Sequence, residues 1–191
     1  MPSPSLRSLL PTLAPIFNLT TDALYERQRA LVRTGLLPAP QGRGRGAGAE
    51  ATPDNVAMLV IAVMATDRFA DTEGVIEKLA NAPCVGQKKG RCPFTGAANF
   101  KDALAFILSS KAPASTPKNT IETVVRVFRA DDPSAHILFD RWPKSEPDGT
   151  FVHFGTREND LPKSCFFVGS ILPSGAVQEI RSALGGSEAA K

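Results

Sequence analysis

The sequence predicts an α+β fold: a helical N-terminal part, then a small antiparallel sheet and a closing helix. Residues 1–112 contain segments whose apolar side chains recur every three or four positions, the spacing of one helix face. Residues 119–191 instead contain short runs rich in β-branched and aromatic residues, separated by turn signals such as Pro147-Asp148-Gly149. Between the two parts, "KAPASTPKN" is rich in Pro, Ala and Ser. We therefore predict two domains, residues 1–112 and residues 119–191.

The composition is that of a globular protein, and it limits the kinds of partner that the protein can have. The 191 residues are 42% hydrophobic, and no apolar run approaches the length of a membrane span. Three cysteines and no recognisable signal peptide predict a cytoplasmic protein with no membrane partner. Charge is uneven, because residues 83–118 hold six Lys or Arg against one Asp or Glu. This pattern suggests an anionic partner, although a solvated basic surface explains it equally well.

The N-terminal part reads as a series of helices. Apolar residues between Leu6 and Phe17 form a helical stripe, but Pro11 and Pro15 predict two short helical pieces or one kinked helix. Thr20 or Thr21 can cap the next helix, which should end at Gly35. Thr52-Pro53-Asp54 is a strong start signal for a buried central helix. Further helices are expected in "DTEGVIEKLANA" and "AANFKDALAFILSS", with "PCVGQKKGRCPFTG" as the loop between them.

The C-terminal part reads as about four strands and one helix. The strands are expected in "TIETVVRVFRA", "AHILFDRW", "TFVHFG" and "SCFFVGSIL", and the helix in "SGAVQEIRSALGG".

The segment "GRGRGAG", residues 42–48, is the most unusual stretch of the chain. No Lys-Ser or Lys-Thr follows it, and its glycines do not give Gly-x-Gly-x-x-Gly, so neither a phosphate-binding loop nor a dinucleotide site is expected. Two interpretations remain. It is a flexible linker, or it is the wing of a DNA-binding domain whose Arg43 and Arg45 contact phosphates or the minor groove.

The order of features around this segment resembles the winged helix-turn-helix of MerR-type regulators. A short helical segment, a turn, a helix ending "LVRTGLLP", the Gly/Arg segment and a Thr-Pro-Asp-capped apolar helix follow one another over residues 5–67. The positions that match the family's pattern are Arg29, Arg33, Gly35, Leu36 and Leu37. The family's tyrosine positions are instead Ala30 and Leu31, the wing lacks Tyr-Arg-x-Tyr, and no long dimerisation helix follows. The resemblance implies winged-helix DNA binding but not the family's way of untwisting promoters.

This resemblance assigns a recognition role to the charged face of the helix before Gly35. Arg29 and Arg33 would contact phosphates or guanine edges, while Asp22, Tyr25 and Glu26 would tune the base preference. A basic cluster further along the chain is a candidate second phosphate-contacting loop. The predicted DNA-binding residues are Thr21, Asp22, Tyr25, Glu26, Arg29, Arg33, Arg43, Arg45, Lys88, Lys89 and Arg91.

The sequence gives little support to catalysis or metal binding. Cys84 and Cys92 form a Cys-x7-Cys pair, longer than the knuckle of structural zinc sites. His136 and His153 fall in expected strands without a nucleophile motif. We therefore expect no catalytic residue, no metal, no cofactor and no enzymatic activity.

The function that follows is a DNA-binding transcriptional regulator, a homodimer that binds double-stranded DNA and is associated with the nucleoid. Two alternatives stay open. One is an architectural DNA-binding protein of larger oligomeric state, resembling the small terminase subunits of phages. The other is a protein-interaction module that does not contact nucleic acid.

Overall fold

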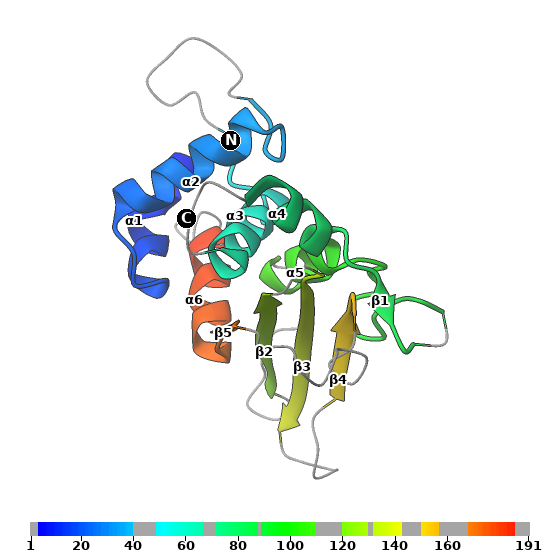
Figure 1. The fold of residues 1–191 in the computed structure, drawn as a ribbon. Coiled ribbons are helices and arrows are strands. Elements are labelled where there is room, and N and C mark those ends of the chain that lie inside the picture. Colours follow the sequence, from blue (N-terminus) through cyan, green and yellow to red (C-terminus); the bar gives the residue numbers. More distant parts are fainter. Residues whose placement is uncertain are drawn as a thin grey trace.

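The computed structural model describes residues 4–39, 49–66, 72–87, 89–109, 120–129, 132–142, 150–156 and 168–185. Within these ranges the helices are α1 (Leu6–Ile16), α2 (Thr21–Arg33), α3 (Pro53–Ala65), α4 (Thr72–Ala80), α5 (Phe100–Leu108) and α6 (Ser174–Gly185). The strands are β1 (Cys84–Val85), β2 (Thr120–Arg129), β3 (Ser134–Trp142), β4 (Thr150–Phe154) and β5 (Val168–Leu172). The α+β class predicted from the sequence is confirmed (Figure 1). No helix of the described residues is long and apolar enough to cross a membrane.

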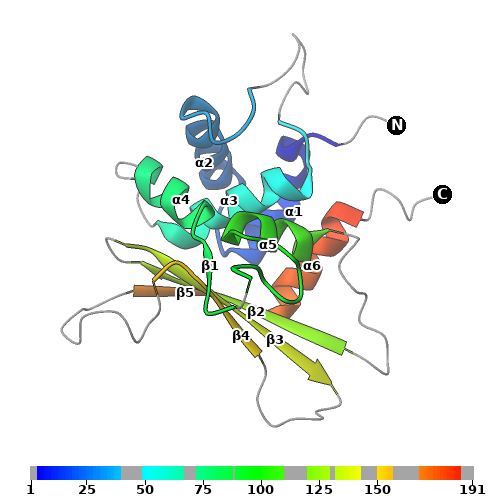
Figure 2. The ribbon, with the colours of Figure 1, turned by 90° about the vertical axis from the view of Figure 1, so that its right-hand side faces the viewer.

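The strands form one antiparallel sheet in the order β1-β4-β3-β2-β5. Figure 2 shows the helices gathered on one face of this sheet. Side chains that point toward the helices are buried, for example Val125, Ile137 and Val152, which lie side by side on β2, β3 and β4. Alternate residues point to the opposite face, because successive side chains of a strand point to opposite sides.

The sheet has one more strand than the sequence predicts. We expected "PCVGQKKGRCPFTG" to be a loop, but Cys84 and Val85 pair with Phe154 and His153 as strand β1 at the edge of the sheet. A strand of two residues is too short to show an alternating pattern, so the sequence carries no signal for it. The turn after β4 supports this edge, because Gly155 N–H donates to the Pro83 carbonyl at 2.9 Å.

The first helix is one continuous element, and the expectation of two separate helical pieces is wrong. Ser5 caps α1 by accepting a hydrogen bond from Ser8 N–H, and the helix includes both Pro11 and Pro15. Both prolines are exposed, whereas Leu6, Leu10 and Leu13 are buried. The carbonyls that lose a helical partner through the prolines therefore lie on the exposed side, where water can bind them.

The third helix is the buried centre of the protein, as predicted. Thr52 caps it through a hydrogen bond from Asn55 N–H at 3.2 Å, Pro53 occupies the first turn, and Asp54 follows. The buried residues of α3 are Val56, Ala57, Met58, Leu59, Val60, Ile61, Ala62, Met64 and Ala65. Its surface contacts α2, α4, α5 and the sheet at β2 and β5. One side chain after another is apolar in this helix because protein surrounds it on nearly every side.

The buried side chains form one continuous cluster that includes members of both predicted domains. Phe100 of α5 lies against Phe154 of β4, with ring centroids 5.6 Å apart. The C-terminal helix α6 packs against α1, α5 and β2, and buries Val177 and Ile180. The first and last helices of the chain therefore lie next to each other, as Figure 1 shows.

The turn at Gly155 provides a test of how tightly β1 and β4 are held. Gly155 and Gly96 both have a positive φ, of 78° and 74°. A Cβ on Gly155 would lie 3.0 Å from the Pro133 carbonyl oxygen, whereas a Cβ on Gly96 would meet nothing within 4 Å. Both Ala variants carry the backbone cost of a left-handed residue, about 1 kcal/mol. We expect Gly155→Ala to lower the free energy of unfolding by roughly 1 kcal/mol more than Gly96→Ala does.

Urea unfolding of the two variants beside the wild type measures this difference directly. Equal losses of stability would show that the close approach to Pro133 relaxes without cost.

Candidate functional site

Helix α2 carries six of the predicted DNA-binding residues on one side. Thr20 caps α2 by accepting from Ala23 N–H at 3.1 Å, and Gly35 ends it with a φ of 76°. Leu24, Gln28 and Leu31 are buried on the inner side. The opposite side, which we call the α2 face, is exposed apart from the half-buried Tyr25; it consists of Thr21, Asp22, Tyr25, Glu26, Arg29 and Arg33.

One residue that the sequence does not point to joins the α2 face. The guanidinium carbon of Arg7, on α1, lies 4.7 Å from the centre of the Tyr25 ring, and that of Arg29 lies 6.0 Å from it. Both distances are within the range of cation–π attraction. Arg7 is exposed, and its contact with Tyr25 depends on how α1 packs against α2. The structure therefore adds a third arginine to the face.

An ion pair lies at the centre of the α2 face. Arg29 Nη1 contacts Glu26 Oε1 at 2.9 Å, and the two side chains are 63% and 55% exposed. A pair this exposed contributes little to stability, because water screens it and both side chains lose freedom. Arg29 can therefore exchange Glu26 for another anion at small cost.

The two arginines of the predicted wing, Arg43 and Arg45, lie outside the described residues. The chain that leads out of this segment returns to the start of α1. Leu6 N–H donates to the Ala49 carbonyl at 2.6 Å, Ala51 N–H donates to the Pro4 carbonyl at 2.8 Å, and Ser5 and Glu50 form an antiparallel bridge. Residues 49–51 thus lie beside the start of α1, in the same helix pair as α2.

The second predicted basic cluster lies away from the α2 face. Lys88 is outside the described residues; Lys89 and Arg91 are exposed in the segment after β1. Arg91 Nη1 donates to the Gly96 carbonyl at 3.0 Å. Figure 1 shows β1 on the opposite side of the molecule from α1 and α2. The structure therefore does not bring this cluster together with the arginines of α2.

The two cysteines of this segment are buried free thiols. Backbone N–H groups of Cys84 and Cys92 donate to the neighbouring carbonyls of Ala98 and Ala97, each at 2.8 Å. Burial raises the pKa of the Cys84 thiol, and the nearby Cys92 raises it further. A raised pKa keeps the thiol protonated and weakly nucleophilic. Cys165 is outside the described residues, and within the described ranges no three His, Cys, Asp or Glu side chains cluster as metal ligands would.

The two histidines, which the sequence left in separate strands, meet on the sheet face away from the helices. The register pairs His136 with His153, and their ring centroids are 4.2 Å apart, edge to face. Phe128 lies 4.6 Å from the His136 ring. His136 is only 4% exposed, and its Nε2 has no hydrogen-bond partner among the residues that the structure describes. Burial, with the charges of His153 and Arg126 nearby, lowers the pKa of His136 to about 4.

This lowered pKa makes stability depend on pH. Between pH 6.5 and about 4 the unfolded chain protonates a histidine that the folded protein keeps neutral. We therefore expect the free energy of unfolding to fall as the pH drops through this range, by at most about 1.4 kcal/mol per pH unit for one proton. Urea unfolding at pH 6.5, 5.5 and 4.5 measures how steeply the free energy of unfolding falls with pH, and this fall should be less steep in His136→Leu than in the wild type. The carboxylates titrate alike in both proteins, so an identical pH dependence would contradict the prediction.

Neither family models nor comparisons with curated proteins and solved structures give a significant match to this chain. The arrangement of the side chains therefore carries the functional argument by itself.

Proposed function

We propose that the protein is a DNA-binding regulator that contacts duplex DNA through the α2 face. The observation that supports this most is the approach of Arg7, from α1, and Arg29, from α2, to Tyr25 on an exposed surface that also carries Arg33. Basic and aromatic side chains from neighbouring helices suit a polyanion, because phosphate contacts supply most of the affinity for DNA.

The geometry of the helix pair supports the same proposal. A short turn, Phe17–Thr20, joins α1 to α2, and Asn18 adopts a left-handed φ of 52° within it. Helix α2 packs against α3, and Leu24 and Leu31 on its inner side are buried, so the body of the protein supports the outer side. In a helix-turn-helix the second helix of such a pair enters the major groove.

The acidic residues of the α2 face bear on selectivity. Asp22 and Glu26 repel phosphates, but a carboxylate can accept a hydrogen bond from the amino group of cytosine. Glu26 also holds Arg29 in the free protein. When Arg29 leaves Glu26 to bind a guanine edge or a phosphate, Glu26 loses its partner. DNA sites that offer hydrogen bonds to both side chains are therefore favoured.

The Gly/Arg segment is the second part of the proposed interface. Residues 49–51, which follow this segment, pair with residues 4–6 at the start of α1, and α1 packs against the helix that carries the α2 face. Arg43 and Arg45 would then contact the phosphate backbone or the minor groove as a wing does, while α2 occupies the major groove.

A homodimer is part of the proposal, because two half-sites raise the affinity and specificity of one small module. Light scattering of the purified protein measures this. A mass corresponding to a larger ring would favour the alternative of an architectural or packaging protein.

A second candidate function, protein interaction without nucleic acid, is supported by the sheet face that lacks helices. Phe151 and Ile171 point to this face and are 43% and 62% exposed. Exposed apolar side chains of this size often mark a contact surface. Failure to shift any duplex at low salt would favour this function over DNA binding.

The DNA proposal is tested with two double variants of equal charge change. Arg29→Ala/Arg33→Ala should bind a mixed-sequence duplex at least tenfold more weakly than the wild type, with a salt slope smaller by about 2 because two phosphate contacts are lost. Arg43→Ala/Arg45→Ala should behave in the same way. Fluorescence anisotropy at several salt concentrations gives both quantities.

The matched control is Arg126→Ala/Arg181→Ala, which removes two charges from the sheet face and α6. It should bind DNA nearly as the wild type does. A similar loss in the control would mean that net charge alone governs binding, and unchanged affinity in Arg29→Ala/Arg33→Ala would remove α2 from the interface.

A further inference from the structure

A cavity of about 350 Å³ lies beside β5, the last strand at one end of the sheet. Its lining includes Ser170, Ile171, Leu172 and Pro173, which follow one another in the chain. Successive side chains of a strand point to opposite faces, so a cavity on one face alone would meet only every second residue. The unbroken run of residues therefore places the cavity along an edge of the strand.

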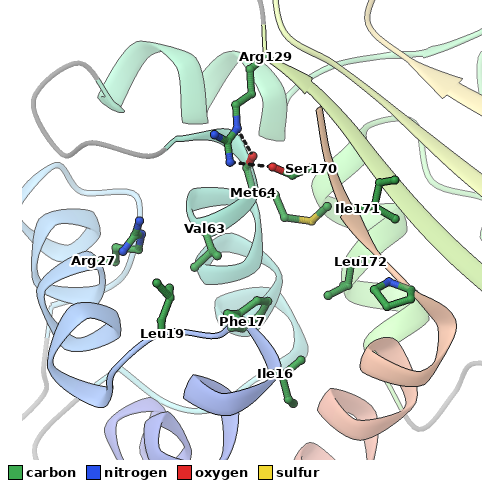
Figure 3. Close-up of a pocket in the computed structure, with 11 residues that line it drawn as sticks. Ile16, Phe17, Leu19, Arg27, Val63, Met64, Arg129, Ser170, Ile171 and Leu172 are labelled. Atoms are coloured by element: carbon green, nitrogen blue, oxygen red, sulfur yellow. Dashed lines mark hydrogen bonds between the residues drawn. The ribbon is translucent and has the colours of Figure 1, made fainter. Parts of the chain in front are cut away.

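This edge of β5 is the one that faces away from β2. The opposite edge pairs with β2 over the whole strand, from Val125↔Leu172 to Arg129↔Val168. Among the strands that the structure describes, β2 is the only one that pairs with β5. Figure 3 shows β2 on one side of β5 and the labelled side chains of α1, α2 and α3 on the other. Every second residue of β5 thus directs its N–H and C=O groups away from β2, which makes the edge a template for a further strand.

The residues of β5 do not protect this edge. Val168 is 47% exposed and Ile171 is 62% exposed, and they are two of the three large apolar side chains exposed in the described ranges. The strand, with the sequence Val-Gly-Ser-Ile-Leu, contains no charged residue and no proline. Edge strands usually carry such residues, because these prevent another chain from pairing. An exposed apolar edge without them is expected where pairing is used.

The opposite wall of the cavity is apolar and limits the size of an occupant. Ile16, Phe17 and Leu19 form this wall and are half-buried. They belong to α1 and to the turn before α2, so the helix pair stands opposite the free edge and leaves room for one strand. Three residues of an edge span about 10 Å, which is short beside the roughly 1,200 Å² of total surface that a stable dimer buries. The remaining lining residues are Arg27, Val63, Met64 and Arg129.

We propose that this edge binds an extended apolar segment of another polypeptide as an added strand of the sheet. The main chain of the segment hydrogen-bonds to the outward N–H and C=O groups of β5, and one of its apolar side chains packs against Phe17 and Leu19. A polypeptide fits such an edge because it repeats donors and acceptors at the spacing of a strand. Strand addition takes its affinity from the main chain and its selectivity from pockets for alternate side chains. This binding requires neither DNA nor the α2 face.

The proposal is tested with fluorescein-labelled heptapeptides of the sequence Lys-Thr-X-Thr-X-Thr-Lys, in which X is valine, leucine or phenylalanine. In fluorescence anisotropy, at least one of them should bind the full chain saturably and one to one. The same peptide with two adjacent central residues N-methylated keeps its side chains but loses a donor from each of its edges. It should bind at least tenfold more weakly, and so should the peptide with serine at both X positions.

Two matched variants of the protein test the apolar wall. Leu19→Ser removes an apolar side chain from the lining of the cavity and should weaken binding of the apolar peptide at least fivefold. Leu36→Ser is the control, because Leu36 is also half-buried and does not line the cavity. This variant should bind the peptide as the wild type does.

Hydrogen exchange of the wild type tests strand addition without any substitution. At saturating peptide, the amides of β5 that point away from β2 should exchange at least threefold more slowly, because the added strand accepts hydrogen bonds from them.

Four results would each overturn strand addition. They are absence of binding by all three apolar peptides, equal affinity for the N-methylated peptide, equal affinities of Leu19→Ser and Leu36→Ser, and unchanged exchange in β5. If the peptide instead halves the mass of the protein in light scattering, a second copy of the chain occupies the edge, which overturns the proposal of a foreign segment. Peptide binding by a protein that never binds DNA would contradict the proposed function and leave this inference standing.

Discussion

The burial of α3 is the constraint on which the rest of the structure depends. Its apolar side chains leave this helix no stable position at the surface, so other elements must surround it. The helix pair α1–α2, the helices α4 and α5, and the strands β2 and β5 all meet around it. Arg129 adds a polar contact at its last turn by donating to the Met64 carbonyl, one of the carbonyls that a helix end leaves without a helical partner.

This central helix also supports α2 and lines a cavity between the helix pair and the sheet. One side of α3 supports α2, whose outer side carries Arg29 and Arg33. Val63 and Met64, near its end, line the cavity that contains Arg27 and Arg129.

Local signals predicted the parts of the fold that local chemistry decides. The sequence predicts a cap at Thr20 or Thr21 and a cap at Thr52 followed by Pro53, and the structure has the caps at Thr20 and Thr52, since a cap needs only its own few neighbours. The sequence could not decide between two helical pieces and one helix at Pro11 and Pro15, because the cost of a proline depends on which side of α1 faces water, and tertiary packing decides that. The approach of Arg7 to Tyr25, the pairing of His136 with His153, and the cavity depend on register or on helix packing. No spacing within one segment reveals contacts of that kind.

The pairing of residues 4–6 with residues 49–51 has a consequence for how the molecule can vary. Residues 4–6 and 49–51 flank the α1–α2 unit and are hydrogen-bonded to each other, so the two ends of this unit lie side by side. Ends that lie close together tolerate insertions between them, because the remainder of a protein need not move. The exposed α2 face can therefore vary in sequence, while the inner sides of α1 and α2 stay constrained by their packing against α6 and α3.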